Sequence, residues 1–375
     1  MVGKVSVELL IGFITGLLAA LLMAAISFLT SLGWGDQFLK GFPSQAPFVL
    51  QLLIPISCGL AIGLLRRAGA EPLPELIETF AQLDPKQDQK LQLEIQPKLS
   101  HILLGLLALL GGGSIGPEAL LSRSLTEWQL GLQRLKTRLA IGGRLAKGYW
   151  SWLPGLIGGF AGFALLKGFD RFGGGEQGVI FLWPNSFSQG ASNLAWALLL
   201  GAGGGCLGLL FLGLRRQLAK RIKRCQASPL PLAIFTGVVL ALVNIWQPLA
   251  LFSGEQQLSP LLQGELLNRA DQLLLVGFLK IALCALCLST GWMGGLFFPL
   301  IIGAAAIGQG LHQAAGIIPG EVAISALVAG IQAMVLAQPW VPFVITVVVL
   351  KGHALPAAVI GSLMGWRLNR YVRDI

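Results

Sequence analysis

The chain has 375 residues, of which 54% are hydrophobic and only 12% are charged. Soluble domains carry about 25% charged residues, so this composition excludes a soluble globular protein and predicts several membrane crossings. The net charge of +10 would suggest a nucleic-acid partner if the protein were soluble. Here Lys and Arg gather in short segments between apolar runs, where they set orientation in the bilayer, so we expect no nucleic-acid partner.

Apolar runs in the first half of the chain alternate with charged or glycine-rich segments. We expect membrane segments at residues 5–32, 48–65, 101–110 and 152–169. The polar stretch at residues 71–98 is expected to be a solvated loop with a short amphipathic helix. The third run ends at Gly111-Gly112-Gly113, and beyond this break we expect a helix from Glu118 to Leu132.

The second half repeats this plan. Apolar runs are expected at residues 193–214, 230–251 and 273–288, with a polar stretch at 256–269. A second glycine-rich break at residues 291–299 opens a helix that reaches about His312. Three further apolar runs, at residues 322–336, 340–350 and 354–366, precede a basic tail. The total is about ten to twelve membrane segments, several of them too short to cross alone.

Three basic groups are expected to share the cytoplasmic side of the membrane. They are Arg66-Arg67, the cluster at residues 215–224 and the tail at 367–373. Lys280, within an apolar run, is expected to snorkel toward a helix end, with a place in the pore as the less favoured alternative, and Trp34 is expected to anchor at the interface. Arg123 and Glu127 have the spacing of an i,i+4 ion pair, although Arg123 could instead favour the charged form of Glu118.

The chain is interpreted as one transmembrane domain, residues 1–375, made of two pseudo-repeats at about 1–180 and 190–375. No soluble regulatory domain is expected. The two glycine-broken segments occupy matching places in the two halves. Such a pair is the best sequence indication of a transport site at the interface of an inverted repeat.

A helix that begins inside a membrane presents unpaired backbone N–H groups and the positive end of its dipole. Because lipid cannot satisfy those groups, a bound anion can do so without any Lys or Arg in the pore. Pro117 and Pro299 have no N–H and are tolerated in a first helical turn. We therefore expect the two helix beginnings to converge and to bind an anion.

Glu118 stands at one of these helix beginnings. An ionisable side chain at such a depth indicates function. Its carboxylate could occupy the place of the anion when charged and leave it when protonated, which would couple gating or exchange to protons. The structural alternative is a carboxylate that caps the helix and is favoured by its dipole.

The two breaks together resemble a known family. The segment GGGSIGPEA, residues 111–119, resembles the GxxxG(K/R)EGP segment of the CLC chloride channels and proton/chloride exchangers, and is closer to the bacterial GPEAP variants. The segment GLFFP, residues 295–299, matches the GxFxP motif of that family. The resemblance implies an all-α polytopic membrane protein with a CLC-like inverted repeat and broken, re-entrant helices.

The resemblance also implies roles for particular residues. Glu118 would be the gating and proton-coupling glutamate. The central anion would be bound by the amides of Leu296 and Phe297. The remaining residues of the expected anion site are Gly116, Pro117, Ala119 and Gly295. The family further implies a homodimer in membrane lipid that carries small anions and possibly protons, with no metal and no cofactor other than the transported anion.

Some family features are altered in this chain. Glu71 stands where the family has the serine of the inner anion site. Tyr371 is the only C-terminal candidate for the pore tyrosine. Residues 165–168, Leu-Leu-Lys-Gly, lie where exchangers carry an inner proton-relay glutamate, and none is present there.

These features leave several functions open. The first is chloride or other small-anion transport through a pore gated by Glu118, in the plasma membrane. The alternatives are a fluoride-selective or atypical antiporter and a non-conducting relative. A membrane-embedded enzyme is disfavoured, because the three histidines are far apart in sequence. Cys284 and Cys287 form a CxxC within an apolar run, which indicates buried thiols.

Overall fold

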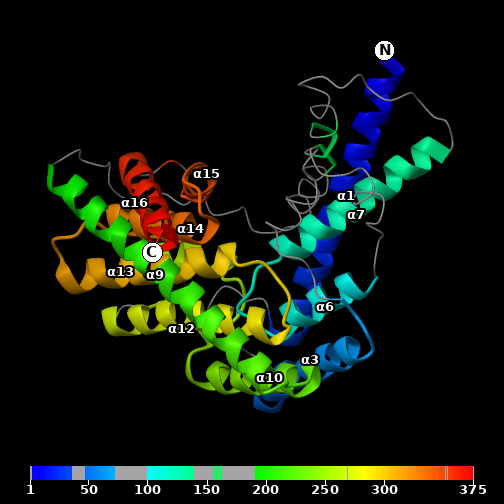
Figure 1. Ribbon diagram of the computed structural model, residues 1–375, viewed down its shortest axis with the longest axis horizontal. Coiled ribbons are helices and arrows are strands. Elements are labelled where there is room, and N and C mark those ends of the chain that lie inside the picture. Colours follow the sequence, from blue (N-terminus) through cyan, green and yellow to red (C-terminus); the bar gives the residue numbers. More distant parts are fainter. Residues whose placement is uncertain are drawn as a thin grey trace.

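A computed structural model describes residues 2–35, 47–71, 99–138, a few positions between 155 and 162, 191–267, 269–350, 352 and 354–374. This part of the chain folds into helices joined by short loops (Figure 1). The α-helices are α1 (Val2–Trp34), α3 (Phe48–Arg67), α6 (Leu99–Leu110), α7 (Glu118–Arg138), α9 (Ala191–Arg224), α10 (Pro229–Trp246), α11 (Leu258–Leu262), α12 (Ala270–Thr290), α13 (Phe297–Ala315), α14 (Gly320–Leu336), α15 (Trp340–Val349) and α16 (Leu355–Asp374).

Five of the described helices, α1, α3, α9, α10 and α12, are long and apolar enough to cross a membrane. The apolar helices α6, α14 and α15 are shorter. This pattern confirms a multi-pass membrane protein that combines full spans with short helices. The expected run at residues 152–169 lies almost entirely outside the described residues.

Several predicted bounds differ from the structure. α7, α9 and α16 continue as helices past the expected ends at residues 132, 214 and 366. The apolar run expected to reach residue 251 ends as a helix at Trp246, because Pro248 cannot continue the hydrogen-bond ladder and starts a short 3₁₀ turn, Pro248–Ala250. The polar stretch at 256–269 holds a second 3₁₀ turn, Glu255–Gln257, and the one-turn helix α11.

The helices of the two halves follow the same order. A long helix, α1 or α9, precedes a second span, α3 or α10. Next comes an apolar helix that ends at a glycine: α6 stops before Gly111, and α12 stops at Gly291, whose φ of 100° favours glycine. After the break follow α7 and α13. The described helices before and after residue 190 thus occur in the same order.

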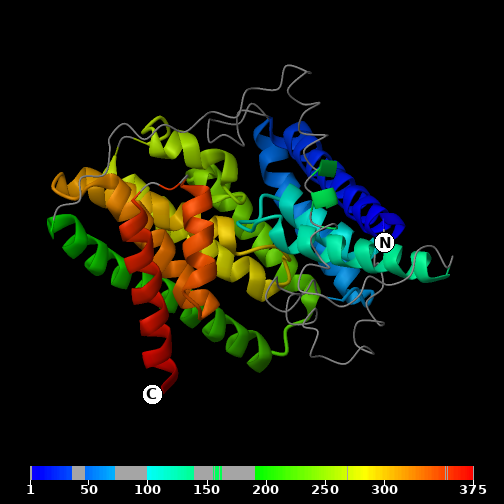
Figure 2. The same cartoon turned by 90° about the horizontal axis from the view of Figure 1, so that it is seen from above.

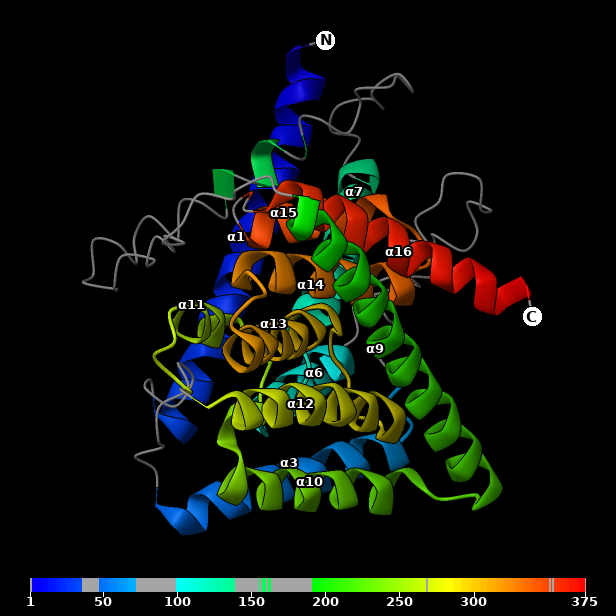
Figure 3. The ribbon, with the colours of Figure 1, turned by 90° about the vertical axis from the view of Figure 1, so that its left-hand side faces the viewer.

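The equivalent helices α3 and α10 lie side by side and antiparallel (Figure 3). Gly59 faces the backbone of Ala233, and Gly63 faces that of Leu230, so the end of α3 meets the start of α10. Glycines allow this approach because any Cβ would strike the neighbouring backbone. The contact joins a helix that precedes residue 190 to one that follows it.

The three basic groups lie on one side of the molecule. The end of α3, at Arg67, is next to the start of α10, and α9 ends at Arg224 shortly before α10 begins. α16 runs parallel to α9, with Gly361 facing Gly201, so its basic end points the same way (Figure 2). The predicted common side is confirmed, and its identity as cytoplasmic remains a prediction.

We predict that Gly59→Ala destabilises the protein. The added Cβ would lie 2.5 Å from the carbonyl oxygen of Ala233, and forced separation of packed elements costs about 1–3 kcal/mol. The midpoint of thermal unfolding of the purified protein should fall.

The matched control is Gly213→Ala on α9, where nothing lies within 4 Å of the added Cβ. This change should leave the midpoint unchanged or raise it slightly, since Ala is favoured over Gly in helices by about 1 kcal/mol. Equal midpoints for the two variants would contradict the close contact of α3 and α10.

Candidate functional site

The two glycine-rich breaks meet and pair with each other. The backbone N–H of Gly116 donates to the carbonyl of Gly295 over 2.7 Å, and that of Gly295 donates to the carbonyl of Gly116 over 2.6 Å. This antiparallel bridge brings the beginning of α7 next to the beginning of α13. The predicted convergence of the two helix beginnings is therefore confirmed.

The carboxylate of Glu118 crosses from one helix beginning to the other. Its Oε1 accepts a hydrogen bond of 2.9 Å from the backbone N–H of Phe298, in the first turn of α13. Its Oε2 is buried and has no hydrogen-bond partner within the described part of the chain. One oxygen thus binds the start of the opposite helix while the other remains unsatisfied, which costs free energy.

Glycine at both bridging positions makes room for this carboxylate. A Cβ built on Gly116 or on Gly295 would collide with the carboxylate oxygens of Glu118. The bridge therefore has two local functions: it fixes the two helix beginnings, and it leaves a gap into which a small negatively charged group fits.

The helix beginnings supply the electrostatic attraction for such a group. The first N–H groups of a helix have no partner within the helix and carry the positive end of its dipole. Ala119, Leu296 and Phe297 are all at most 7% exposed, so this attraction acts away from water. In a medium of low dielectric constant it is stronger than at a surface.

The bridge changes the expected set of anion-binding amides. The N–H groups of Gly116 and Gly295 each already donate to the carbonyl of the other residue, and Pro117 has no N–H. In this state these three residues shape the site and do not donate to an anion. The amides of Ala119, Leu296 and Phe297 remain the expected donors, and Glu118 identifies Phe298 as a further one.

Lys280 makes hydrogen bonds both to the first break and to the turn after α10. Its side chain is fully buried, and its Nζ donates to the carbonyls of Leu249 and Leu251 over 3.0 and 2.8 Å. The carbonyl of Lys280 itself accepts a hydrogen bond of 3.2 Å from the Ser114 hydroxyl in the first break. The expectation that Lys280 snorkels is therefore wrong, because carbonyls of the turn after α10 accept hydrogen bonds from its Nζ inside the protein.

Two buried tryptophans fix the glycine turns. Trp34 Nε1 donates over 2.8 Å to the carbonyl of Leu110, the last residue of α6. Trp292 Nε1 donates over 3.0 Å to the carbonyl of Ala233, and its ring covers Gly111. Trp34 is completely buried, so its expected position at the membrane interface is wrong.

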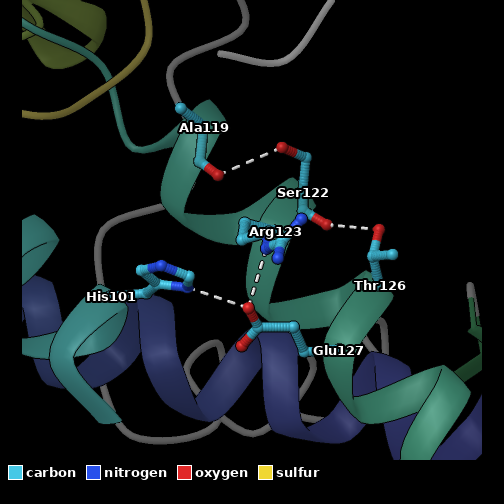
Figure 4. A network of polar contacts seen from close by, with 6 residues as sticks. All are labelled: His101, Ala119, Ser122, Arg123, Thr126 and Glu127. Carbon is cyan, nitrogen blue, oxygen red and sulfur yellow. Dashed lines mark hydrogen bonds and ion pairs between the residues drawn. The ribbon is translucent and has the colours of Figure 1, made fainter. Parts of the chain in front are cut away.

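A second polar cluster lies further along α7 (Figure 4). Glu127 Oε1 accepts a hydrogen bond of 2.7 Å from Arg123 Nε and lies 2.8 Å from His101 Nδ1 on α6. The predicted i,i+4 ion pair is confirmed. Because Arg123 is paired with Glu127, the structure gives no support to the alternative that it favours the charged form of Glu118.

The structure does not bring the two inner-site candidates to the breaks. Glu71 is exposed just after α3, and Tyr371 is 66% exposed near the end of α16. A residue that lines a closed anion site should be buried, so the placement does not support these assignments. Residues 165–168, where the relay glutamate of exchangers is missing, lie outside the described residues.

Sequence reasoning missed Gln332 on α14. This side chain is fully buried, and its Nε2 donates over 3.0 Å to the carbonyl of Phe297. A signal was present, because a carboxamide inside the apolar run at residues 322–336 is costly without a partner.

Known proteins resemble this chain in sequence and in fold. A family model described as "Voltage gated chloride channel" matches residues 148–367. "Putative ion-transport protein YfeO" of Escherichia coli O1:K1 is 28% identical over 134 residues, which is 35% of this chain and 32% of that protein. A Shigella boydii protein of the same name gives the same figures. The aligned segment therefore spans about a third of the length of these relatives.

Two solved structures share the fold over nearly the whole chain. One is the crystal structure of a CLC-type fluoride/proton antiporter, with a TM-score of 0.67, 19% identity, and coverage of 97% of this chain and 94% of the other. The other is that of a slow cyanobacterial Cl⁻/H⁺ antiporter, with a TM-score of 0.69, 16% identity, and coverage of 98% and 94%. At such identities the likeness establishes the fold.

We predict that Lys280→Met destabilises the protein strongly. The substitution keeps the apolar length but removes the donor to the carbonyls of Leu249 and Leu251. Buried acceptors left unpaired cost about 1–3 kcal/mol each, so the midpoint of thermal unfolding should fall by several degrees. The control is Lys220→Met on the exposed part of α9. If both variants unfold at the temperature of the parent, Lys280 does not support the breaks.

Proposed function

Since the chain belongs to the voltage gated chloride channel family, we propose that it moves small anions across the membrane through the paired helix beginnings. The main support for this proposal is one observation. A carboxylate of the chain itself, that of Glu118, already occupies the N–H of Phe298, where an external anion would bind.

In this mechanism Glu118 is a tethered anion that competes with the transported one. Its charged carboxylate satisfies the amide of Phe298 and closes the site. A free anion that reaches the amides of Ala119, Leu296, Phe297 and Phe298 displaces the carboxylate. The dipoles of two helices then hold the ion without a full positive charge, so it can be released again.

Protons enter the mechanism through the same carboxylate. Hydrogen bonds to a charged acceptor are roughly twice as strong as neutral ones. Protonation of Glu118 therefore weakens its contact with Phe298 and frees the site for an anion. The buried Oε2 has no hydrogen-bond partner within the described part of the chain, so it is the oxygen at which we expect the proton to be taken up.

Further properties of the proposed transporter follow from the family. We propose a homodimer in the plasma membrane, with each chain forming one transmembrane domain made of two pseudo-repeats, and with no enzymatic activity. The order of the helices and the antiparallel contact of α3 with α10 support the two-repeat arrangement.

We predict that Glu118 sets the pH dependence of anion flux. In proteoliposomes the parent should release chloride faster as pH falls, because protonation removes the blocking charge. Glu118→Gln should release chloride at a rate that no longer depends on pH. The control is Asp271→Asn, which removes a carboxylate that is paired with Arg269 and 64% exposed, and it should keep the parental profile. Chloride and pH electrodes record the two ions together.

The same vesicles identify the ion and the coupling. Chloride, nitrate and fluoride are tested one at a time, and fluoride flux alone would identify a fluoride transporter. Proton uptake driven by anion efflux would identify an exchanger, and its absence a channel. If none of the three anions crosses faster than in protein-free vesicles, or if Glu118→Gln keeps the parental pH profile, the proposed mechanism is wrong.

A further inference from the structure

The peptide unit between Phe297 and Phe298 is hydrogen-bonded at both of its ends. Its N–H donates to Glu118 Oε1 over 2.9 Å, and its carbonyl accepts from Gln332 Nε2 over 3.0 Å. The two partners come from different helices, α7 and α14. One peptide of α13 thus links the carboxylate of Glu118 on one side to the carboxamide of Gln332 on the other.

The orientation of the Gln332 carboxamide follows from this contact. A carbonyl oxygen can accept only from the NH₂ group, because the side-chain oxygen in that place would repel it. The remaining atom, Oε1, is buried and has no hydrogen-bond partner within the described part of the chain. The protein therefore keeps a polar group here whose hydrogen bonds are only half satisfied, at a cost that an apolar side chain would avoid.

We propose that Gln332 is a positioning residue for the anion site: it holds and polarises the peptide whose N–H binds the anion. The role rests on the proposed function. Donation to the carbonyl of Phe297 makes the N–H of Phe298 a stronger donor, since hydrogen bonds in a chain reinforce one another. It also keeps the peptide plane from turning while Glu118 leaves and the anion enters.

The simpler explanation is that Gln332 only fastens α14 to α13. Asn369 on α16 provides a matched comparison for that explanation. It is 5% exposed, and its Nδ2 donates over 2.7 Å to the carbonyl of Met334 on α14. Both residues are buried carboxamides bound to a backbone carbonyl, but the peptide that Asn369 binds is not part of the breaks.

The experiment measures chloride binding to the purified full chain by calorimetry. All variants carry Glu118→Gln, so that the tethered carboxylate does not compete. Gln332→Met removes the donor at similar length, and Asn369→Leu removes the comparison donor. Thermal unfolding of each protein is recorded in parallel.

Gln332→Met should bind chloride about threefold to tenfold more weakly, as expected for loss of one hydrogen bond that acts on the ligand's donor. Asn369→Leu should bind within twofold of the Glu118→Gln protein, even if its unfolding temperature falls as much. Fluoride is measured as a second probe and should show the same order.

A third variant, Gln332→Glu, adds a second readout, the pH dependence of chloride affinity. A residue that only fastens α14 to α13 would not change this dependence. When protonated, the new side chain can still donate to the carbonyl of Phe297, and when charged it cannot. Chloride affinity should therefore recover at low pH in this variant alone. The Gln332→Glu variant also tests the proposal if the Gln332→Met protein does not fold.

Three outcomes would overturn the proposal. Gln332→Met could bind chloride as the Glu118→Gln protein does, Asn369→Leu could lose as much affinity as Gln332→Met, or Gln332→Glu could show no recovery at low pH. Each of these results rejects the positioning role of Gln332 but does not contradict the proposed function. If the Glu118→Gln protein itself binds neither chloride nor fluoride, the proposed function fails and this role fails with it.

Discussion

The structure depends on the reciprocal hydrogen bonds between Gly116 and Gly295. Each glycine lies in a break, two residues before a helix begins, so their pairing fixes two positive helix ends at one buried place. Two such ends repel each other unless negative charge lies between them. The carboxylate of Glu118 supplies that charge, and the absence of a Cβ on either glycine gives it room.

The groups behind the bridge hold it in a membrane, where water cannot satisfy an irregular backbone. Lys280, Trp34 and Trp292 each donate to backbone carbonyls at or near the ends of α6 and α10. The site itself has backbone donors and no full positive charge among its described contacts. The buried side chains around the bridge therefore provide stability. The backbone amides of the site provide the moderate attraction that reversible anion binding requires.

The sequence predicted the membrane class, most helix positions and the meeting of the two breaks, because apolar runs and glycine-rich interruptions are local patterns. It did not predict which amide Glu118 uses, nor that Gly116 and Gly295 bind each other, because those bonds join residues far apart in the chain. Lys280 was misjudged for the same reason: its partners are carbonyls of a turn that only tertiary packing brings near. Gln332 was visible as a polar residue in an apolar run, but the peptide it binds was not.

The most direct test of the account is to locate a heavy halide in crystals of the Glu118→Gln protein soaked in bromide. The account predicts anomalous density within hydrogen-bonding distance of the backbone nitrogen of Phe298, between the beginnings of α7 and α13. Bromide bound elsewhere, with none at this nitrogen, would contradict the claim that the two helix beginnings form the anion site.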